Sequence, residues 1–280
     1  MTPRAGEGVA LDPAIRAYYD RSAEETRLER GPSQLEALRT RRVIERHAPA
    51  PPAIVLDVGG AAGAYASWLA ESGYSVHLVD AVPRLVDAAR RLSASLSQPI
   101  VSCEVGDARA LPCRAAFADI VLLLGPLYHL TSATDRGRAL GEAARVLKPG
   151  GVLFAAGISR WASALDGLAR DLFADPKFVD IVEQDLRDGQ HRNATEQIGY
   201  FTTAYFHRPE ELRDEVTRAA LDVQGLFGLE GPSWILPDFD DRWADHRRRS
   251  DMIRLAEAVE SEPSLLGASA HLLVVARKPG

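Results

Sequence analysis

Short apolar runs alternate with amphipathic stretches through the middle of the chain. Runs of this length that end at glycine, proline or acidic residues predict buried strands. They lie near residues 53–58, 75–80, 100–104, 118–124 and 151–157. Helical patterns separate most of them, and strands that alternate with helices form parallel sheets. This region therefore predicts a doubly wound α/β fold.

The segments on either side of this region predict additions to the sheet. Two helices, from Pro13 to about Glu29 and from Ser33 to His47, form an N-terminal arm. Residues 158–207 are helical and polar-aromatic, and they are too long for an ordinary connection, so they predict an inserted cap. Residues 223–276 contain two further strands and a helix, which would complete a seven-stranded, mostly parallel sheet.

We therefore expect four parts along the chain. They are the helical arm at 1–52, a Rossmann-like core that binds a cofactor at 53–157, a helical and aromatic substrate cap at 158–207, and the remainder of the core at 208–280.

The first strand ends in a glycine-rich turn that predicts a nucleotide-cofactor site. Gly59, Gly60 and Gly63 permit a tight strand-to-helix turn and a close approach of the backbone to a ligand. Asp80 ends the next strand, 23 positions after Asp57, which is the spacing of a ribose-binding carboxylate. The alternative is that Asp80 caps the following helix.

Several segments resemble the class I S-adenosylmethionine-dependent methyltransferases. Residues 57–63 resemble the acidic-x-Gly-x-Gly-x-Gly loop of that family, with Ala61 in place of the middle glycine. Residues 105–108 match the segment that places an acidic side chain and a backbone amide beside the adenine. Residues 119–129 and 147–151 follow in the order and at the spacing of the family.

This resemblance implies S-adenosylmethionine as the cofactor. It implies cofactor contacts from the strand ends and turns: Asp57, Gly59, Gly60, Ala61, Gly63, Asp80, Ala81, Asp107, Ala108, Leu124 and Gly125. The arm resembles the leading helices that fold across the cofactor in related enzymes, which adds Tyr19 and Arg39. Arg39 could pair with the cofactor carboxylate through a bidentate contact. The alternative is an ordinary amphipathic helix pair.

The loop after the fourth predicted strand carries the candidates for catalysis. His129 could take a proton from a hydroxyl or amine while that group is methylated, and Tyr128 could position the acceptor. The alternative is that His129 only packs or caps the next helix.

The cap and the rim loop carry the candidates for acceptor binding, because aromatic walls with a few polar groups are typical of small-molecule sites. These candidates are Arg160, His191, Tyr200, Tyr205 and Trp234. The alternative is that the aromatic residues from Tyr200 onward pack within the cap.

The charge and composition of the chain disfavour several kinds of binding partner. The net charge is −6, and arginines lie beside acidic residues rather than in a basic stripe, which disfavours a nucleic-acid partner. We expect no membrane partner and a cytoplasmic location, because no apolar run of membrane-spanning length or signal core occurs. His191 and His207 lack metal-ligand spacing with a nearby carboxylate or thiol, so no metal is expected. The oligomeric state is not indicated.

The sequence thus predicts a methyltransferase that acts on a small molecule, with oxygen, nitrogen and carbon acceptors all left open. A protein or peptide methyltransferase is one alternative, and it would need an open groove. A cofactor-binding protein without catalysis is another. A nicotinamide enzyme is disfavoured, because no tyrosine-lysine pair of the kind that reductases use is apparent.

Overall fold

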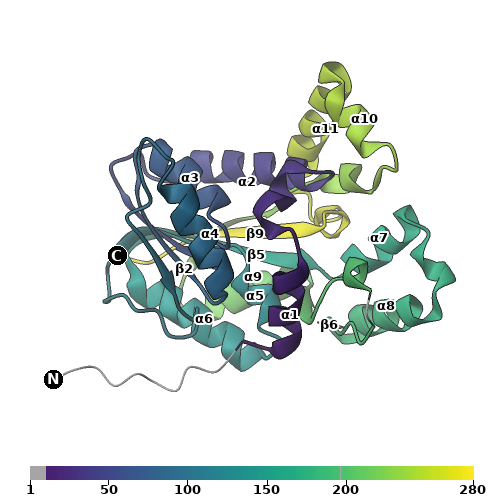
Figure 1. Cartoon of the computed structure of the whole chain (residues 1–280), viewed down its shortest axis with the longest axis horizontal. Coiled ribbons are helices and arrows are strands. Elements are labelled where there is room, and N and C mark those ends of the chain that lie inside the picture. Colours follow the sequence, from purple (N-terminus) through teal and green to yellow (C-terminus); the bar gives the residue numbers. More distant parts are fainter. Residues whose placement is uncertain (1–10, 196) are drawn as a thin grey trace.

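The computed structural model describes residues 11–195 and 197–280, and the first ten residues of the predicted arm lie outside this part. A mixed sheet crosses the molecule (Figure 1). Its strands are β1 (Ile54–Val58), β2 (Ser75–Asp80), β3 (Ser102–Val105), β4 (Ala118–Leu123), β5 (Leu147–Ser159), β6 (Gln190–His191), β7 (Ala204–His207), β8 (Asp222–Gly228) and β9 (His271–Arg277).

Seven of these strands form the predicted core sheet. β3, β2, β1, β4 and β5 are parallel neighbours in that order. β9 pairs antiparallel with β5, and β8 pairs antiparallel with β9. The doubly wound, mostly parallel fold is therefore confirmed.

Helices and 3₁₀ turns (η) cover the sheet and extend beyond it. They are α1 (Pro13–Arg21), η1 (Glu24–Glu29), α2 (Ser33–His47), α3 (Ala64–Glu71), α4 (Pro83–Ser93), α5 (Pro126–His129), α6 (Ala133–Val146), α7 (Ala162–Ala169), η2 (Leu172–Ala174), α8 (Pro176–Asp188), η3 (Ile198–Tyr200), α9 (Pro209–Arg218), η4 (Gly231–Ile235), α10 (Phe239–Ala244), α11 (His246–Val259) and η5 (Leu266–Ala268).

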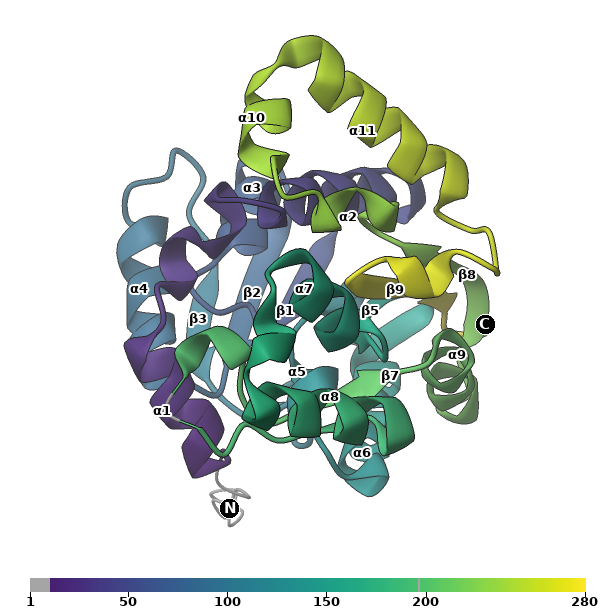
Figure 2. The same cartoon turned by 90° about the vertical axis from the view of Figure 1, so that its right-hand side faces the viewer.

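Helices cover both faces of the sheet (Figure 2). An apolar core lies between the sheet and the helices on each face. On one face, α2, α3 and α4 bury side chains such as Val43, Leu69 and Val86 against the strands. On the other, α6 and α9 bury residues such as Leu140 and Leu212. This arrangement leaves the carboxyl ends of β1, β2 and β4 free for a site, as open α/β sheets do.

Two elements differ in extent from what the sequence predicts. The arm is not one helix to Glu29, because α1 ends at Arg21 and a separate 3₁₀ turn, η1, follows. β5 begins at Leu147 instead of 151, and its far end, Ile158 and Ser159, pairs with β7. β7 returns from the segment that we predicted as a cap, so this pairing attaches that segment to the sheet. The division into arm, core and cap stays a prediction.

Among the described residues, none of the helices combines the length and the apolar character that crossing a membrane requires.

Candidate active site

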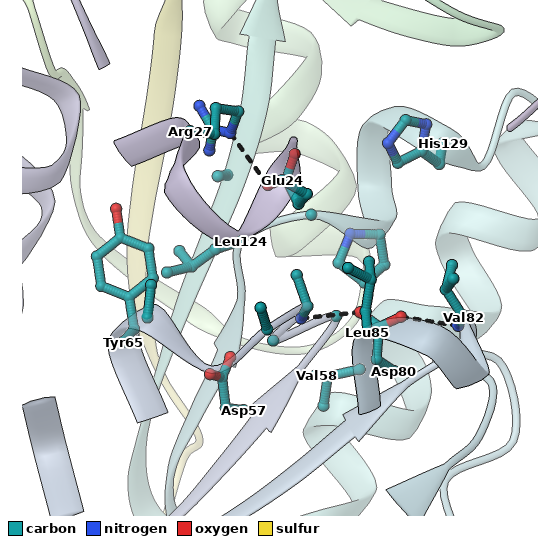
Figure 3. A pocket seen from close by; sticks show the side chains of 18 of the residues that line it. Glu24, Arg27, Asp57, Val58, Tyr65, Asp80, Val82, Leu85, Leu124 and His129 are labelled. Atoms are coloured by element: carbon teal, nitrogen blue, oxygen red, sulfur yellow. Dashed lines mark hydrogen bonds and ion pairs between the residues drawn. The ribbon is translucent and has the colours of Figure 1, made fainter. Parts of the chain in front are cut away.

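A cavity of about 1000 Å³ lies at the carboxyl ends of β1, β2 and β4 (Figure 3). The arm contributes part of its wall through α1 and η1. Nearly all of the predicted cofactor residues line it: Tyr19, Asp57, Gly59, Gly60, Ala61, Asp80, Ala81, Asp107, Ala108, Leu124 and Gly125. Tyr128 and His129 line it as well. The structure therefore brings together segments that are far apart in the sequence.

Two glycines of the turn after β1, Gly59 and Gly60, have no room for a side chain. A Cβ on Gly59 would lie 2.5 Å from Cδ of Pro126, and one on Gly60 would lie 2.6 Å from Oδ2 of Asp57. Gly63 is not part of the cavity lining but adopts a φ of +91° at the start of α3. Its role is to set the turn, because few other residues adopt this conformation without strain.

Asp80 binds the backbone on both sides of the cavity floor. Its Oδ2 accepts a hydrogen bond from the amide of Ala61 (2.9 Å), and its Oδ1 accepts one from the amide of Val82 (2.8 Å). The alternative that Asp80 caps the following helix is not borne out, because Val82 is the N-cap of α4 and this helix start has no side-chain cap. Each carboxylate oxygen accepts more than one hydrogen bond, so a ribose diol could bind in addition.

Asp57 is a buried carboxyl group without a complete set of partners. It is only 1% exposed, and its Oδ2 has no hydrogen-bond partner among the described residues. Burial and the nearby Asp80 carboxylate raise the pKa of Asp57 to about 7. An ammonium group would satisfy this carboxyl, which fits the amino-acid end of S-adenosylmethionine.

We expect cofactor binding to release a proton through Asp57. Below pH 7 the free protein holds the carboxyl proton, and a cationic partner lowers the pKa and expels it. At about pH 6, calorimetric titration with S-adenosylhomocysteine in buffers of different ionisation enthalpy should show release of close to one proton. Asp57→Asn should abolish this release. Equal release by the variant would contradict the assignment.

Arg27 lines the cavity and Arg39 does not, so the prediction for Arg39 is wrong. Arg27 donates to both oxygens of Glu36 (2.7 and 3.0 Å) and to Glu24 (3.1 Å), and all three residues line the cavity. Arg39 is 1% exposed and pairs with Glu257 and Glu260 instead.

Tyr19 and His129 join the arm to the loop after β4. The Tyr19 hydroxyl lies 2.7 Å from Nε2 of His129, and Nδ1 lies 3.3 Å from the carbonyl oxygen of Thr203. A carbonyl only accepts, so Nδ1 carries the proton and Nε2 accepts from Tyr19. Burial lowers the pKa of His129 to about 4. In this arrangement both ring nitrogens are engaged, which leaves no free base.

A smaller pocket of about 250 Å³ adjoins the cavity and has aromatic walls. Tyr18, Phe178, Tyr200, Phe201, Phe206 and Trp234 line it. Five residues line both spaces: Tyr19, Glu24, Arg27, Tyr128 and His271. Of the predicted acceptor residues, Tyr200 and Trp234 are therefore at this pocket.

The structure does not bring the other three predicted acceptor residues to either pocket. Arg160 is 3% exposed and donates to the carbonyl of Phe206 and to Glu211. His191 is buried between Asp185 and the carbonyl of Tyr200.

Tyr205 contacts two arginines and a carboxylate. Its ring lies 3.7 Å from the guanidinium carbon of Arg136 and 5.7 Å from that of Arg160, and its hydroxyl donates to Glu211. All three predictions are corrected, because these polar groups satisfy one another inside the protein.

Glu24, Arg27 and His271 also line this cavity, although they are not among the predicted site residues. Arg27 lies in a 3₁₀ turn, where helical spacing does not show which face is buried. His271 could have been found from the sequence, because it is the polar residue at the start of the apolar run that forms β9.

Comparisons with known proteins identify the family of the chain. The family described as "Methyltransferase domain" matches residues 56–155. The ubiquinone/menaquinone biosynthesis C-methyltransferase UbiE of Acidiphilium cryptum is 30% identical over 185 residues, covering 65% of this chain and 72% of that protein. The ubiquinone biosynthesis O-methyltransferase of Methylocella silvestris is 34% identical over 118 residues, covering 41% of this chain but only 44% of that protein.

Solved structures show the same fold at low sequence identity. An S-adenosylmethionine-dependent methyltransferase from Methanosarcina mazei superposes with a TM-score of 0.57 at 18% identity, covering 85% of this chain and 97% of the other. One from Mesorhizobium loti gives 0.58 at 16% identity, covering 87% and 100%. The chain belongs to the S-adenosylmethionine-dependent methyltransferases, and S-adenosylmethionine is its cofactor.

Proposed function

We propose that the protein transfers a methyl group from S-adenosylmethionine to a small-molecule acceptor. The observation that carries this proposal is the small aromatic pocket that shares five lining residues with the cofactor cavity. A volume of about 250 Å³ suits one compact ring system, whereas a protein substrate would need an open groove. The names of the two relatives, which refer to ubiquinone biosynthesis, support the same proposal.

Methyl transfer requires mainly that the two reacting groups are held in the correct positions. The cofactor supplies an activated methyl group, and the protein must hold a nucleophile in line with it at short range. We propose that the cavity residues from β1, β2 and β4 hold the cofactor, while Tyr128, Tyr200 and Trp234 help to place the acceptor.

Two measurements test this function in sequence. Calorimetric titration with S-adenosylmethionine and S-adenosylhomocysteine should give low-micromolar dissociation constants, typical of metabolite sites. Mass spectrometry of incubations with small phenols, amines and a peptide mixture should then show methylation of small molecules. Methylation confined to peptides would favour the protein methyltransferase. Cofactor binding without turnover of any acceptor would favour a binding protein without catalysis.

A further inference from the structure

His271 and Glu230 meet at the border between the two pockets. They are 41 positions apart, and the antiparallel pairing of β8 with β9 brings them together. The amide of Leu229 donates to the carbonyl of His271 (3.1 Å), which fixes this end of the strand pair. His271 lines both pockets, so its ring stands where a cofactor in one and an acceptor in the other would meet.

Glu230 fixes both the position and the tautomer of His271. Its Oε1 lies 2.6 Å from Nδ1 of His271, and its Oε2 accepts a hydrogen bond from the backbone amide of the same residue (3.0 Å). Glu230 is 1% exposed. An ionised carboxylate only accepts, so Nδ1 carries the proton and the neutral ring presents an unprotonated Nε2.

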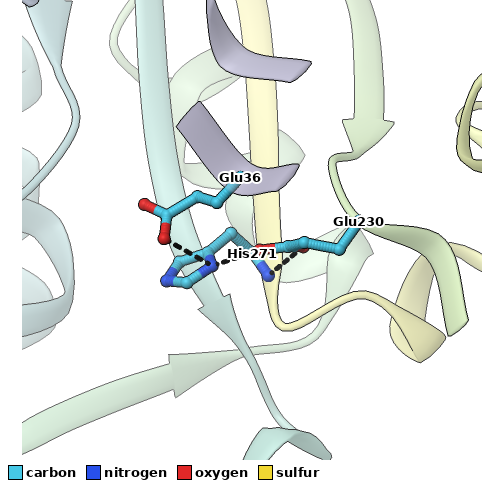
Figure 4. Close-up of side chains that lie close together, drawn as sticks. All are labelled: Glu36, Glu230 and His271. Atoms are coloured by element: carbon cyan, nitrogen blue, oxygen red, sulfur yellow. Dashed lines mark hydrogen bonds and ion pairs between the residues drawn. The ribbon is translucent and has the colours of Figure 1, made fainter. Parts of the chain in front are cut away.

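Nε2 of His271 is available to a ligand. No described residue forms a hydrogen bond with it, and it is not among the described atoms that are buried without a partner. The nitrogen lies on the side of the ring away from Glu230 (Figure 4). His129 differs in this respect, because its Nε2 already binds Tyr19.

The charges around His271 favour a proton on the ring. Glu230 lies beside Nδ1, and Glu36 of α2 lies 3.8 Å from it. Burial alone lowers the pKa of His271, but these two carboxylates outweigh burial and raise it, against a smaller opposing effect of Arg27 from η1. Arg27 also compensates Glu36, so the cluster does not require a cation.

We propose that His271 is the general base for the methyl acceptor, that Glu230 is its positioning residue, and that the acceptor is a single aromatic ring with a hydroxyl group. This inference rests on the proposed function. Nε2 takes the hydroxyl proton while an oxygen lone pair forms the new bond to the methyl carbon. The electron pair of the broken carbon–sulfur bond stays on sulfur, which becomes a neutral thioether. The proton's charge then resides on the imidazolium beside Glu230 and Glu36.

The binding of a coloured phenol tests the proposal without requiring methyl transfer. We would titrate protein saturated with S-adenosylhomocysteine with 4-nitrophenol and follow the phenolate absorbance against pH. In the wild type, the imidazole should lower the pKa of the bound phenol by about one pH unit or more. His271→Asn should lose this shift and Glu230→Gln should reduce it. The matched control is His246→Asn, because His246 is exposed on α11.

Results that differ from these expectations would contradict the proposal. Failure of 4-nitrophenol to bind overturns the aromatic acceptor, and an unchanged shift in His271→Asn overturns the base. Failure of the wild type to bind S-adenosylhomocysteine overturns the proposed function instead. Nitrogen-15 spectra of the wild-type histidine rings need no variant that must fold: they should show the His271 proton on Nδ1, and a proton on Nε2 in the neutral ring would overturn the assignment.

Discussion

Asp80→Ala is expected to weaken the binding of S-adenosylhomocysteine about a hundred-fold, since two charge-assisted hydrogen bonds to a ribose are worth about 1.5 kcal/mol each. The variant also loses the hydrogen bonds from the amides of Ala61 and Val82, which hold the glycine turn against the start of α4. Asp80→Asn keeps one acceptor oxygen, so its loss of affinity should be smaller. Calorimetric titration measures both.

Asp87→Ala is the matched control for this prediction. Asp87 is exposed on α4, seven positions after Asp80, and pairs only locally with Arg90. Its removal should leave the dissociation constant unchanged. If Asp80→Ala bound as tightly as the wild type while remaining folded, the ribose assignment of Asp80 would be wrong.

Arg136→Met is expected to lower the free energy of unfolding by about 3–5 kcal/mol, the usual cost of breaking one side of a buried ion pair. Arg136 of α6 is 2% exposed, and its Nε and one terminal nitrogen bind Glu215 of α9. Its other terminal nitrogen donates to the carbonyls of Leu130 and Thr131. The substitution leaves the Glu215 charge buried without its main partner. Urea denaturation measures the change.

Arg138→Met provides the control, because Arg138 lies on the same helix but is 61% exposed and has only a 3.7 Å pair with Asp135. It should change stability by less than about 1 kcal/mol. A similar small change for Arg136→Met would show that the pair contributes little.

The same ion pair makes the stability of the wild-type protein depend on pH. Burial opposes ionisation of Glu215, but His207 and Arg136 outweigh it and lower the pKa of this carboxyl from 4.5 to about 2. The contribution of Glu215 to stability is therefore complete above pH 4.5 and is lost as the pH falls toward 2.

The core of the fold could be predicted because its signals are local. Buried parallel strands appear as apolar runs, and the glycine turn and Asp80 follow two of them at the expected distance. β1, β2 and β4 accordingly lie within one residue of their predicted bounds. The early start of β5 was missed, because Lys148, Pro149 and the glycines that follow read as a turn.

The polar contacts of the arm, the predicted cap and β9 could not be predicted, because they depend on which groups meet in three dimensions. Arg39 and Arg27 both belong to the arm, and only the packing of α2 against α11 shows that Arg39 pairs with Glu257. Arg160 and His191 have the composition of a binding site but satisfy buried partners of their own. The pair of Glu230 and His271 depends on the register between β8 and β9.

The arm links the two pockets energetically. Tyr19, Glu24 and Arg27 contribute to the walls of both, so one segment must be in place for either pocket to be complete. A ligand in one pocket that stabilises this segment therefore raises the affinity of the other pocket, and by thermodynamic reciprocity the two effects are equal in size. The arm thus couples the two pockets in addition to any contact between the molecules that they hold.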